Sequence, residues 1–238
     1  IVLHFIDFWI PELNIKYIMR QFYVCSYGGS GSKMLVKYLE NFGKVFHIHS
    51  RFPPDKLTHS GGINNYIEWF NNNVIDEETM KNVTVIYIYR NPIDAILSRF
   101  TNPLHLFHIQ VFKDKDIIEM KKITNDKNYN EKYKDYQNYK LSDITSEMKD
   151  LYGIDEFYNN YTTPNLNRNY KIYAINYDKF FDNIKEINKI LNLPDNTKIY
   201  PVKSERTKKY DSEIIDKLNI VYKDLNDKMQ KMNFIEII

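Results

Sequence analysis

The chain has little of several features that would define its function at once. One cysteine, Cys25, in 238 residues excludes an internal disulfide framework and any cysteine-rich zinc site. We interpret Cys25 as a small buried hydrophobic residue of the first strand. Glycine is scarce as well, at 7 residues, so a short segment that contains three of them stands out.

Excess charge of one sign and long apolar runs are also missing. A net charge of +2 argues against a nucleic-acid-binding protein, which needs a strongly basic surface. The apolar start is interrupted by Asp7, Pro11 and Glu12, is shorter than the roughly 20 residues of a membrane span, and does not resemble a signal peptide. We therefore expect a soluble, cytoplasmic protein without a membrane span.

Two further expectations follow from the composition and from the start of the chain. The abundance of Asn, Lys, Ile and Tyr is typical of an AT-rich source organism or virus, so single Asn and Lys residues carry little functional weight. Because the chain does not begin with Met, we interpret residues 1–20 as an N-terminal extension, from either a partial or an upstream-extended reading frame, with Met19 as the natural start.

The sequence alternates between strand-like and helix-like segments. Apolar runs rich in β-branched and aromatic residues predict strands at 21–27, 44–50, 82–90 and 170–176. Helical spacing lies between them, and a terminal helix is expected from about Ser212. This order predicts an α/β, three-layer, P-loop-like fold with a central parallel β-sheet flanked by helices. We expect a single domain over 21–238 that includes a helical, substrate-side region at about 104–168.

The glycine-rich segment "YGGSGSKML" follows the first predicted strand and opens a helix. Gly28, Gly29 and Gly31 allow a tight turn whose backbone N–H groups converge on an anion at the helix N-terminus. An ATP-binding loop has Lys directly after its last Gly and then Ser or Thr. Here Ser32 comes before Lys33, so the lysine is one place late. Taken alone, the segment also suits a glycine-rich turn with no ligand.

A second motif, "YIYRNPIDAILSRF", resembles the 3'-phosphate-binding segment of sulfotransferases that use 3'-phosphoadenylyl sulfate (PAPS). In that family an arginine ends a strand, and a serine eight residues later lies on the next helix. Arg90 and Ser98 match this spacing, and a guanidinium and a hydroxyl both bind phosphate well. An ordinary ion pair at the end of a strand would explain Arg90 but not the serine spacing or the upstream loop.

The glycine-rich segment then resembles the 5'-phosphosulfate loop of the same family, P-[KR]-[ST]-G-[ST]-[ST]-x-L. Gly28 replaces the proline, Gly29 replaces the basic residue, and Lys33 stands where a hydroxyl is common. The resemblance implies that donor-binding residues run through the loop and the start of the helix: Gly28, Gly29, Ser30, Gly31, Ser32, Lys33 and Met34.

A third resemblance lies near the end of the chain. "IYAINYDKFFDNIKEINKILNLP" is similar to the family's strand, Y-E-x-L turn and helix, with Tyr177 at the tyrosine position. "SERTKKYD" stands where the family often has another basic contact to the 3'-phosphate, and Arg206 is the candidate. Together the matches cover 22–51, 83–100 and 172–194 in the family's order.

The resemblance implies an enzyme that moves a sulfuryl group from PAPS to a hydroxyl or amine, with a small molecule or saccharide as acceptor and no metal. His49 is the expected catalytic base, assisted by His47 on the same face of the strand. Lys33 would replace the missing basic residue at the leaving oxygen. The open alternatives for the base are His59, Asp55 and Glu68.

Two other functions remain open. A P-loop nucleotide or small-molecule kinase would bind Mg-ATP, but the loop lacks G-K-[ST] and the third predicted strand ends in Arg90. A non-catalytic PAP(S)-binding protein could keep the fold without the basic residue that Gly29 replaces. We find no His, Cys or carboxylate pattern with metal-ligand spacing, and we interpret His105 and His108 as helix packing.

Overall fold

The computed structural model describes residues 20–48, 53, 83–100, 140–151, 153–203 and 210–238. Its sheet contains β1 (Gln21–Cys25), β2 (Lys44–Ile48), β3 (Val83–Tyr89), β4 (Ile172–Asn176) and β5 (Ile235–Ile237). Its α-helices are α1 (Ser32–Leu39), α4 (Pro92–Arg99), α8 (Leu141–Glu147), α9 (Ile154–Thr162), α10 (Tyr177–Phe180), α11 (Ile184–Ile190), α12 (Ser212–Val221) and α13 (Lys223–Lys231). The predicted α/β class is confirmed.

The five strands form one mixed sheet in the order β2-β1-β3-β4-β5. β1 pairs in parallel with both β2 and β3, and β3 pairs in parallel with β4. All four strands predicted from the sequence therefore lie in this sheet. Because β2, β1, β3 and β4 run parallel to one another, their carboxyl ends meet at one edge of the sheet.

The predicted parallel sheet is extended by one antiparallel strand, and the terminal helix predicted from about Ser212 is divided in two. The helical pattern from Ser212 divides into α12 and α13, and the chain then turns into β5. β5 pairs antiparallel with β4, and Ile235 lies opposite Ile175. The three residues of β5 form a strand because they pair with β4, and such tertiary pairing outweighs the local sequence preference of a short apolar segment.

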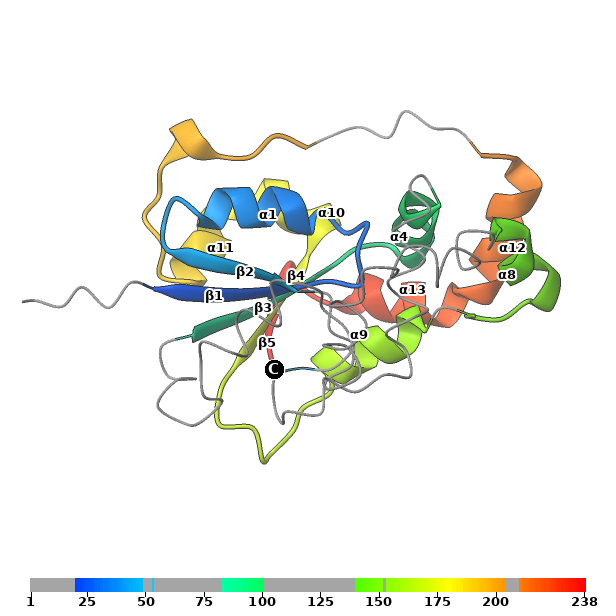
Figure 1. The fold of residues 1–238 in the computed structure, drawn as a ribbon, viewed down its shortest axis with the longest axis horizontal. Coiled ribbons are helices and arrows are strands. Elements are labelled where there is room, and N and C mark those ends of the chain that lie inside the picture. Colours follow the sequence, from blue (N-terminus) through cyan, green and yellow to red (C-terminus); the bar gives the residue numbers. More distant parts are fainter. Residues whose placement is uncertain (1–19, 49–52, 54–82, 101–139, 152, 204–209) are drawn as a thin grey trace, which may run out of the picture.

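Helices pack on both faces of the sheet, and the side chains of each strand alternate between the two faces. On one face Phe22, Val24 and Ile88 pack with α1, α10 and α11. On the other face the strands pack with α9, which lies on the opposite side of the sheet in Figure 1. Continuous apolar runs in β1 and β3 are what a strand covered on both faces requires.

The second face is built largely from tyrosines. Tyr87 stacks on Tyr161 of α9 with ring centroids 4.7 Å apart, and the Tyr23 and Tyr161 hydroxyl oxygens lie 3.1 Å apart. Burial raises the pKa of both Tyr87 and Tyr161 well above the usual tyrosine value. The abundance of tyrosine in the sequence therefore partly reflects core packing, to which each ring contributes a large aromatic area.

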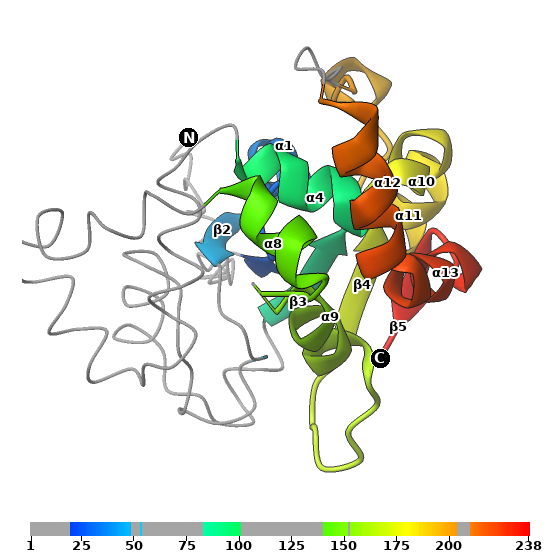
Figure 2. The same ribbon diagram turned by 90° about the vertical axis from the view of Figure 1, so that its right-hand side faces the viewer.

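The helices that follow the carboxyl edge form a group of their own. α12 packs against both α4 and α8 (Figure 2). The Tyr210 hydroxyl, just before α12, donates to the Leu97 carbonyl of α4 at 2.9 Å. α4 is thus fixed between the sheet and the C-terminal helices, which holds its last turn against the glycine-rich loop. No helix in the described ranges is long and apolar enough to cross a membrane.

Candidate functional site

A cavity of about 250 Å³ lies at the carboxyl edge of the sheet. Its lining comes from the ends of three parallel strands and from the helices α1, α4 and α10: Gly28, Gly29, Gly31, Ser32, Lys33, His47, Arg90, Ser98, Arg99 and Tyr177. β1 and β3 are neighbours in the sheet, but the strand that follows β1 lies on one side of this pair and the strand that follows β3 lies on the other. In open α/β sheets ligands bind at such a switch point, outside the carboxyl ends of the strands.

Three glycines of the loop have backbone conformations that other residues adopt with strain. Gly28, Gly29 and Gly31 have φ angles of 104°, 66° and 77°. Each also faces a group from another element, and a Cβ built on it would lie 1.6 Å from Arg99 Nη2, 2.6 Å from the Ala95 carbonyl oxygen or 2.2 Å from the Tyr177 ring, respectively. The loop therefore needs glycine at these positions for close packing as well as for conformation.

Gly29 shows why no basic residue stands at this position of the loop. A Cβ there would lie 2.8 Å from Ser98 Cβ as well as against the Ala95 carbonyl oxygen. Helix α4 therefore comes so close to the loop that a lysine or arginine side chain at position 29 has no room. A glycine at position 29 is thus matched by the close packing of α4.

The two serines of the loop lie inward. Ser30 is buried, and its hydroxyl donates to the Gly28 carbonyl oxygen at 3.3 Å. Ser32 begins α1 and is buried beside the cavity, where its Oγ lies 2.9 Å from His47 Nε2. The following Lys33 is exposed at the cavity rim. The loop thus brings one hydroxyl and one ammonium group to the same cavity.

His47 lies on β2 and reaches the cavity from the side of α1. Burial, followed by the positive charges of Lys33 and Arg99, lowers the pKa of His47 from 6.5 to about 4. The imidazole is therefore neutral at physiological pH and can accept a proton. The two cations that lower its pKa also make the cavity favourable for an anion.

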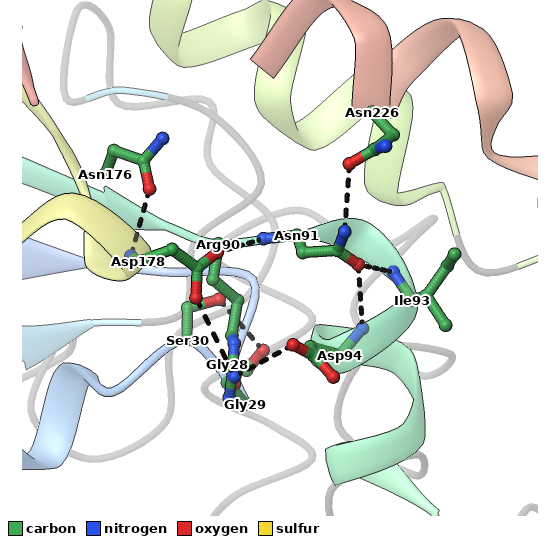
Figure 3. Close-up of polar contacts among 10 residues, drawn as sticks. All are labelled: Gly28, Gly29, Ser30, Arg90, Asn91, Ile93, Asp94, Asn176, Asp178 and Asn226. Carbon is green, nitrogen blue, oxygen red and sulfur yellow. Dashed lines mark hydrogen bonds and ion pairs between the residues drawn. The ribbon is translucent and has the colours of Figure 1, made fainter. Parts of the chain in front are cut away.

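Arg90 follows β3 and is held from several sides (Figure 3). Its Nη1 donates to the Gly29 carbonyl oxygen at 3.3 Å, and its Nη2 donates to Asp94 Oδ2 at 3.1 Å. Asp178 Oδ1 lies 3.9 Å from the same Nη2, and the Tyr177 ring centroid lies 4.8 Å from Arg90 Cζ. Within the described chain the buried Arg90 Nε has no hydrogen-bond partner.

The turn after Arg90 is fixed by Asn91. Its Oδ1 accepts from the backbone N–H groups of Ile93 and Asp94, which caps α4. Its Nδ2 donates to Asn226 Oδ1, and its backbone N–H donates to Asp178 Oδ2 (Figure 3). Pro92 at the first helical position also favours this helix start. The "RNP" turn therefore ties the ends of β3 and β4 to α13.

The structure brings together most of the residues predicted from the sequence. The glycines of the loop, Ser32, Lys33, His47, Arg90, Ser98 and Tyr177 line one cavity, and Ser30 lies in the same loop. Met34 instead lines a separate cavity of about 470 Å³ beside Tyr38 and Tyr200, so its side chain does not reach the loop cavity. His49, Arg206 and the alternative bases His59, Asp55 and Glu68 lie outside the described residues, as do His105 and His108.

Sequence reasoning did not select Arg99, which lines the same cavity. A usable signal was present, because Arg99 lies three residues after Ile96 and four after Ala95 and so belongs to the inward face of α4. The acidic neighbours of Arg90, Asp94 and Asp178, were also not predicted. Within the described ranges no cluster of three His, Cys or carboxylate side chains is placed to hold a metal ion.

Comparisons of the chain with models of protein families, with curated proteins and with solved structures found no match. The functional argument therefore depends on this chain's own residues and on the geometry of the cavity.

Proposed function

We propose that the chain is a PAPS-dependent sulfotransferase of three-layer, P-loop-like α/β fold. The observation that supports this most directly is the cavity itself. Three segments that are far apart in the sequence supply the glycine-rich loop with Ser32, the pair Arg90 and Ser98, and Tyr177 to one cavity. Arginine, hydroxyl and loop N–H groups are what a nucleotide with two phosphates requires.

The donor would bind along the carboxyl edge of the sheet. Its 5'-phosphosulfate would lie on the loop and the start of α1, near Ser32 and Lys33. Its 3'-phosphate would bind Arg90 and Ser98. The guanidinium of Arg90 is held against Tyr177 and Gly29 by contacts within the protein, so binding orders few further groups.

In the proposed reaction an acceptor hydroxyl oxygen attacks the sulfur in line with the bridging oxygen to the 5'-phosphate. A new S–O bond forms, the old one breaks, and the leaving oxygen keeps its electron pair as 3'-phosphoadenosine 5'-phosphate. Lys33 stabilises the charge that develops on this oxygen. The acceptor's proton passes to a base: His49 as predicted, with neutral His47 in the cavity as its partner.

The function is tested by calorimetric titration of the full chain with 3'-phosphoadenosine 5'-phosphate, beside ATP with magnesium. We expect micromolar binding of the bisphosphate, weakened about 30-fold or more by Arg90→Ala, the scale of a lost charge-assisted contact. Lys217→Ala is the matched control, because it removes a cation from another i,i+4 ion pair, with Glu213 on α12.

Three outcomes separate the alternatives. Bisphosphate binding followed by transfer from PAPS to hydroxyl or saccharide acceptors supports the enzyme. Binding without transfer to any acceptor favours the non-catalytic protein. This alternative is specific because position 29 has no room for a basic side chain at the leaving oxygen. Magnesium-dependent ATP binding with no response to the bisphosphate would instead favour the kinase and exclude the proposal.

A further inference from the structure

Arg99 is the last residue of α4 and lies deep in the wall of the cavity. Its side chain is 2% exposed. Its Nη2 donates to the Tyr27 carbonyl oxygen, and its Cζ lies 5.5 Å from the centroid of the Tyr27 ring. The guanidinium is therefore fixed against the first residue of the glycine-rich loop.

The loop bends around this guanidinium. A Cβ on Gly28 would lie 1.6 Å from Arg99 Nη2 and 1.9 Å from its Cζ. The guanidinium thus fills the space in which a side chain at position 28 would begin. At the next position, Ser98 and the Ala95 carbonyl oxygen fill the space beside Gly29 in the same way. The last turn of α4 therefore occupies the space beside both Gly28 and Gly29.

The charge of Arg99 acts on the cavity. Burial lowers the pKa of Arg99 to about 10, so the guanidinium remains charged at neutral pH. The same charge, after Lys33, contributes to the lowered pKa of His47. A buried cation is costly unless other groups compensate it. An anionic group bound beside it would lower that cost, and here the neighbouring loop N–H groups could bind the same anion.

We infer that Arg99 binds the phosphate that lies on the Tyr27–Gly31 loop, whereas Arg90 binds the other phosphate of the nucleotide. This inference depends on the proposed function and adds a binding residue to it. The positive charge that a basic residue at position 29 could supply comes instead from α4, from the residue next to Ser98. One helix then contacts both phosphates of the donor, with Ser98 and Arg99 in consecutive positions.

The test compares ligands that carry either phosphate alone with the ligand that carries both. Adenosine 5'-phosphate, adenosine 3'-phosphate and the 3',5'-bisphosphate are titrated into the full chain with Arg99, Arg99→Gln or Arg99→Lys. We expect Arg99→Gln to weaken the binding of adenosine 5'-phosphate and of the bisphosphate at least tenfold. The affinity for adenosine 3'-phosphate should stay within twofold of that of the unaltered chain. Arg90→Ala should give the opposite pattern, with the loss confined to ligands that carry the 3'-phosphate.

Arg99→Lys keeps a cation and a donor for the Tyr27 carbonyl group, so it provides a second variant if Arg99→Gln does not fold. We expect a loss of about threefold to tenfold for the 5'-phosphate alone, because an ammonium group cannot make the bidentate contact. Melting temperatures of all variants without ligand check folding. Equal losses for the two monophosphates would assign Arg99 a purely structural role and overturn the inference.

The two proposals can fail separately. If the unaltered chain binds the bisphosphate and both folded Arg99 variants bind it equally well, the Arg99 inference is wrong while the proposed function stands. If the unaltered chain binds none of the adenosine phosphates, the proposed function itself is wrong. Binding of inorganic sulfate or phosphate to the unaltered chain, abolished by Arg99→Gln, would then limit Arg99 to an anion site of another kind.

Discussion

The two ends of α4 differ in how they hold an arginine at the same cavity. Arg90, just before the helix, keeps 19% of its side-chain surface exposed and contacts the carboxylates of Asp94 and Asp178. Arg99, at the last helical position, is 2% exposed and contacts the Tyr27 ring and carbonyl group. One arginine is therefore balanced by acidic side chains, and the other by an aromatic ring and the loop backbone.

This difference separates two ways of making an anion site. At the Arg90 end, a ligand must compete with carboxylates that already attract the guanidinium. At the Arg99 end, the loop itself is shaped around the charge, since Gly28 gives it room. The first arrangement allows exchange of partners, and the second gives a fixed charge that depends on the glycines.

A single added methyl group should disrupt the close contact between α4 and the glycine-rich loop. Gly29→Ala places a Cβ against the Ala95 carbonyl oxygen at a φ of 66°. We expect a loss of about 3 kcal/mol in unfolding free energy, from left-handed strain together with overpacking. Chemical denaturation measures the loss, and bisphosphate binding should fall with it.

Gly153→Ala is the matched control for Gly29→Ala. Gly153 precedes α9, away from the cavity, with a φ of 65°. The substitution should cost about 1 kcal/mol from backbone strain alone. Equal losses at Gly29 and Gly153 would show that the close approach of α4 contributes nothing to stability.

A second prediction concerns His47, whose pKa depends on the cations at the cavity. Its pKa is lowered to about 4, so the unfolded chain binds a proton near pH 6.5 that the folded chain does not. His47 therefore contributes stability above pH 6.5 that is lost as the pH falls towards 4. The difference between the unaltered chain and His47→Gln should change by about 2 kcal/mol across this range, as measured by denaturation at each pH.

The pKa of His47 also shows which cations lie near its ring. Removal of the Lys33 or Arg99 charge, by Lys33→Gln or Arg99→Gln, should raise the pKa of His47, with the larger change for Lys33. Arg90→Gln is the control, and we expect it to change this pKa less. The titration of the His47 ring signals by NMR gives the answer. A larger shift from Arg90→Gln would reverse the assignment of the two arginines to the two ends of the cavity.

Much of this arrangement could be predicted from local sequence patterns. β1 and β3 are apolar runs long enough to form buried strands, and the glycines of the loop indicate the turn without any tertiary information. Arg90 was selected because its segment, with Ser98 eight residues later, resembles the 3'-phosphate-binding segment of PAPS-dependent sulfotransferases. These features depend on residues that are close in the sequence.

The features that were missed depend on packing between distant segments. The direction of β5 is set by pairing with β4, which no pattern of three residues specifies. Arg99 has an inward position on α4, but only the approach of Gly28 shows that its guanidinium enters a cavity wall. Similarly, only the packing of Ser98 against Gly29 shows that a side chain at position 29 has no room.

The smallest expected effect concerns the acidic side of the Arg90 end. Asp94→Asn keeps the size of the side chain but removes the charge that faces Arg90 Nη2 at 3.1 Å. Because the pair is partly exposed, its interaction is worth about 0.5 kcal/mol. We expect the bisphosphate to bind two- to threefold more tightly, since the phosphate no longer competes with a carboxylate for the guanidinium.

The control is Glu213→Gln, which removes a carboxylate from the Lys217 pair on α12 and should leave affinity unchanged. Adenosine 5'-phosphate should also be unaffected by Asp94→Asn if the carboxylate competes only at the Arg90 end. Weaker bisphosphate binding by Asp94→Asn would mean that Asp94 orients the guanidinium more than it competes for it. The carboxylates would then orient Arg90 for the ligand without competing with it, and the contrast with the Arg99 end would disappear.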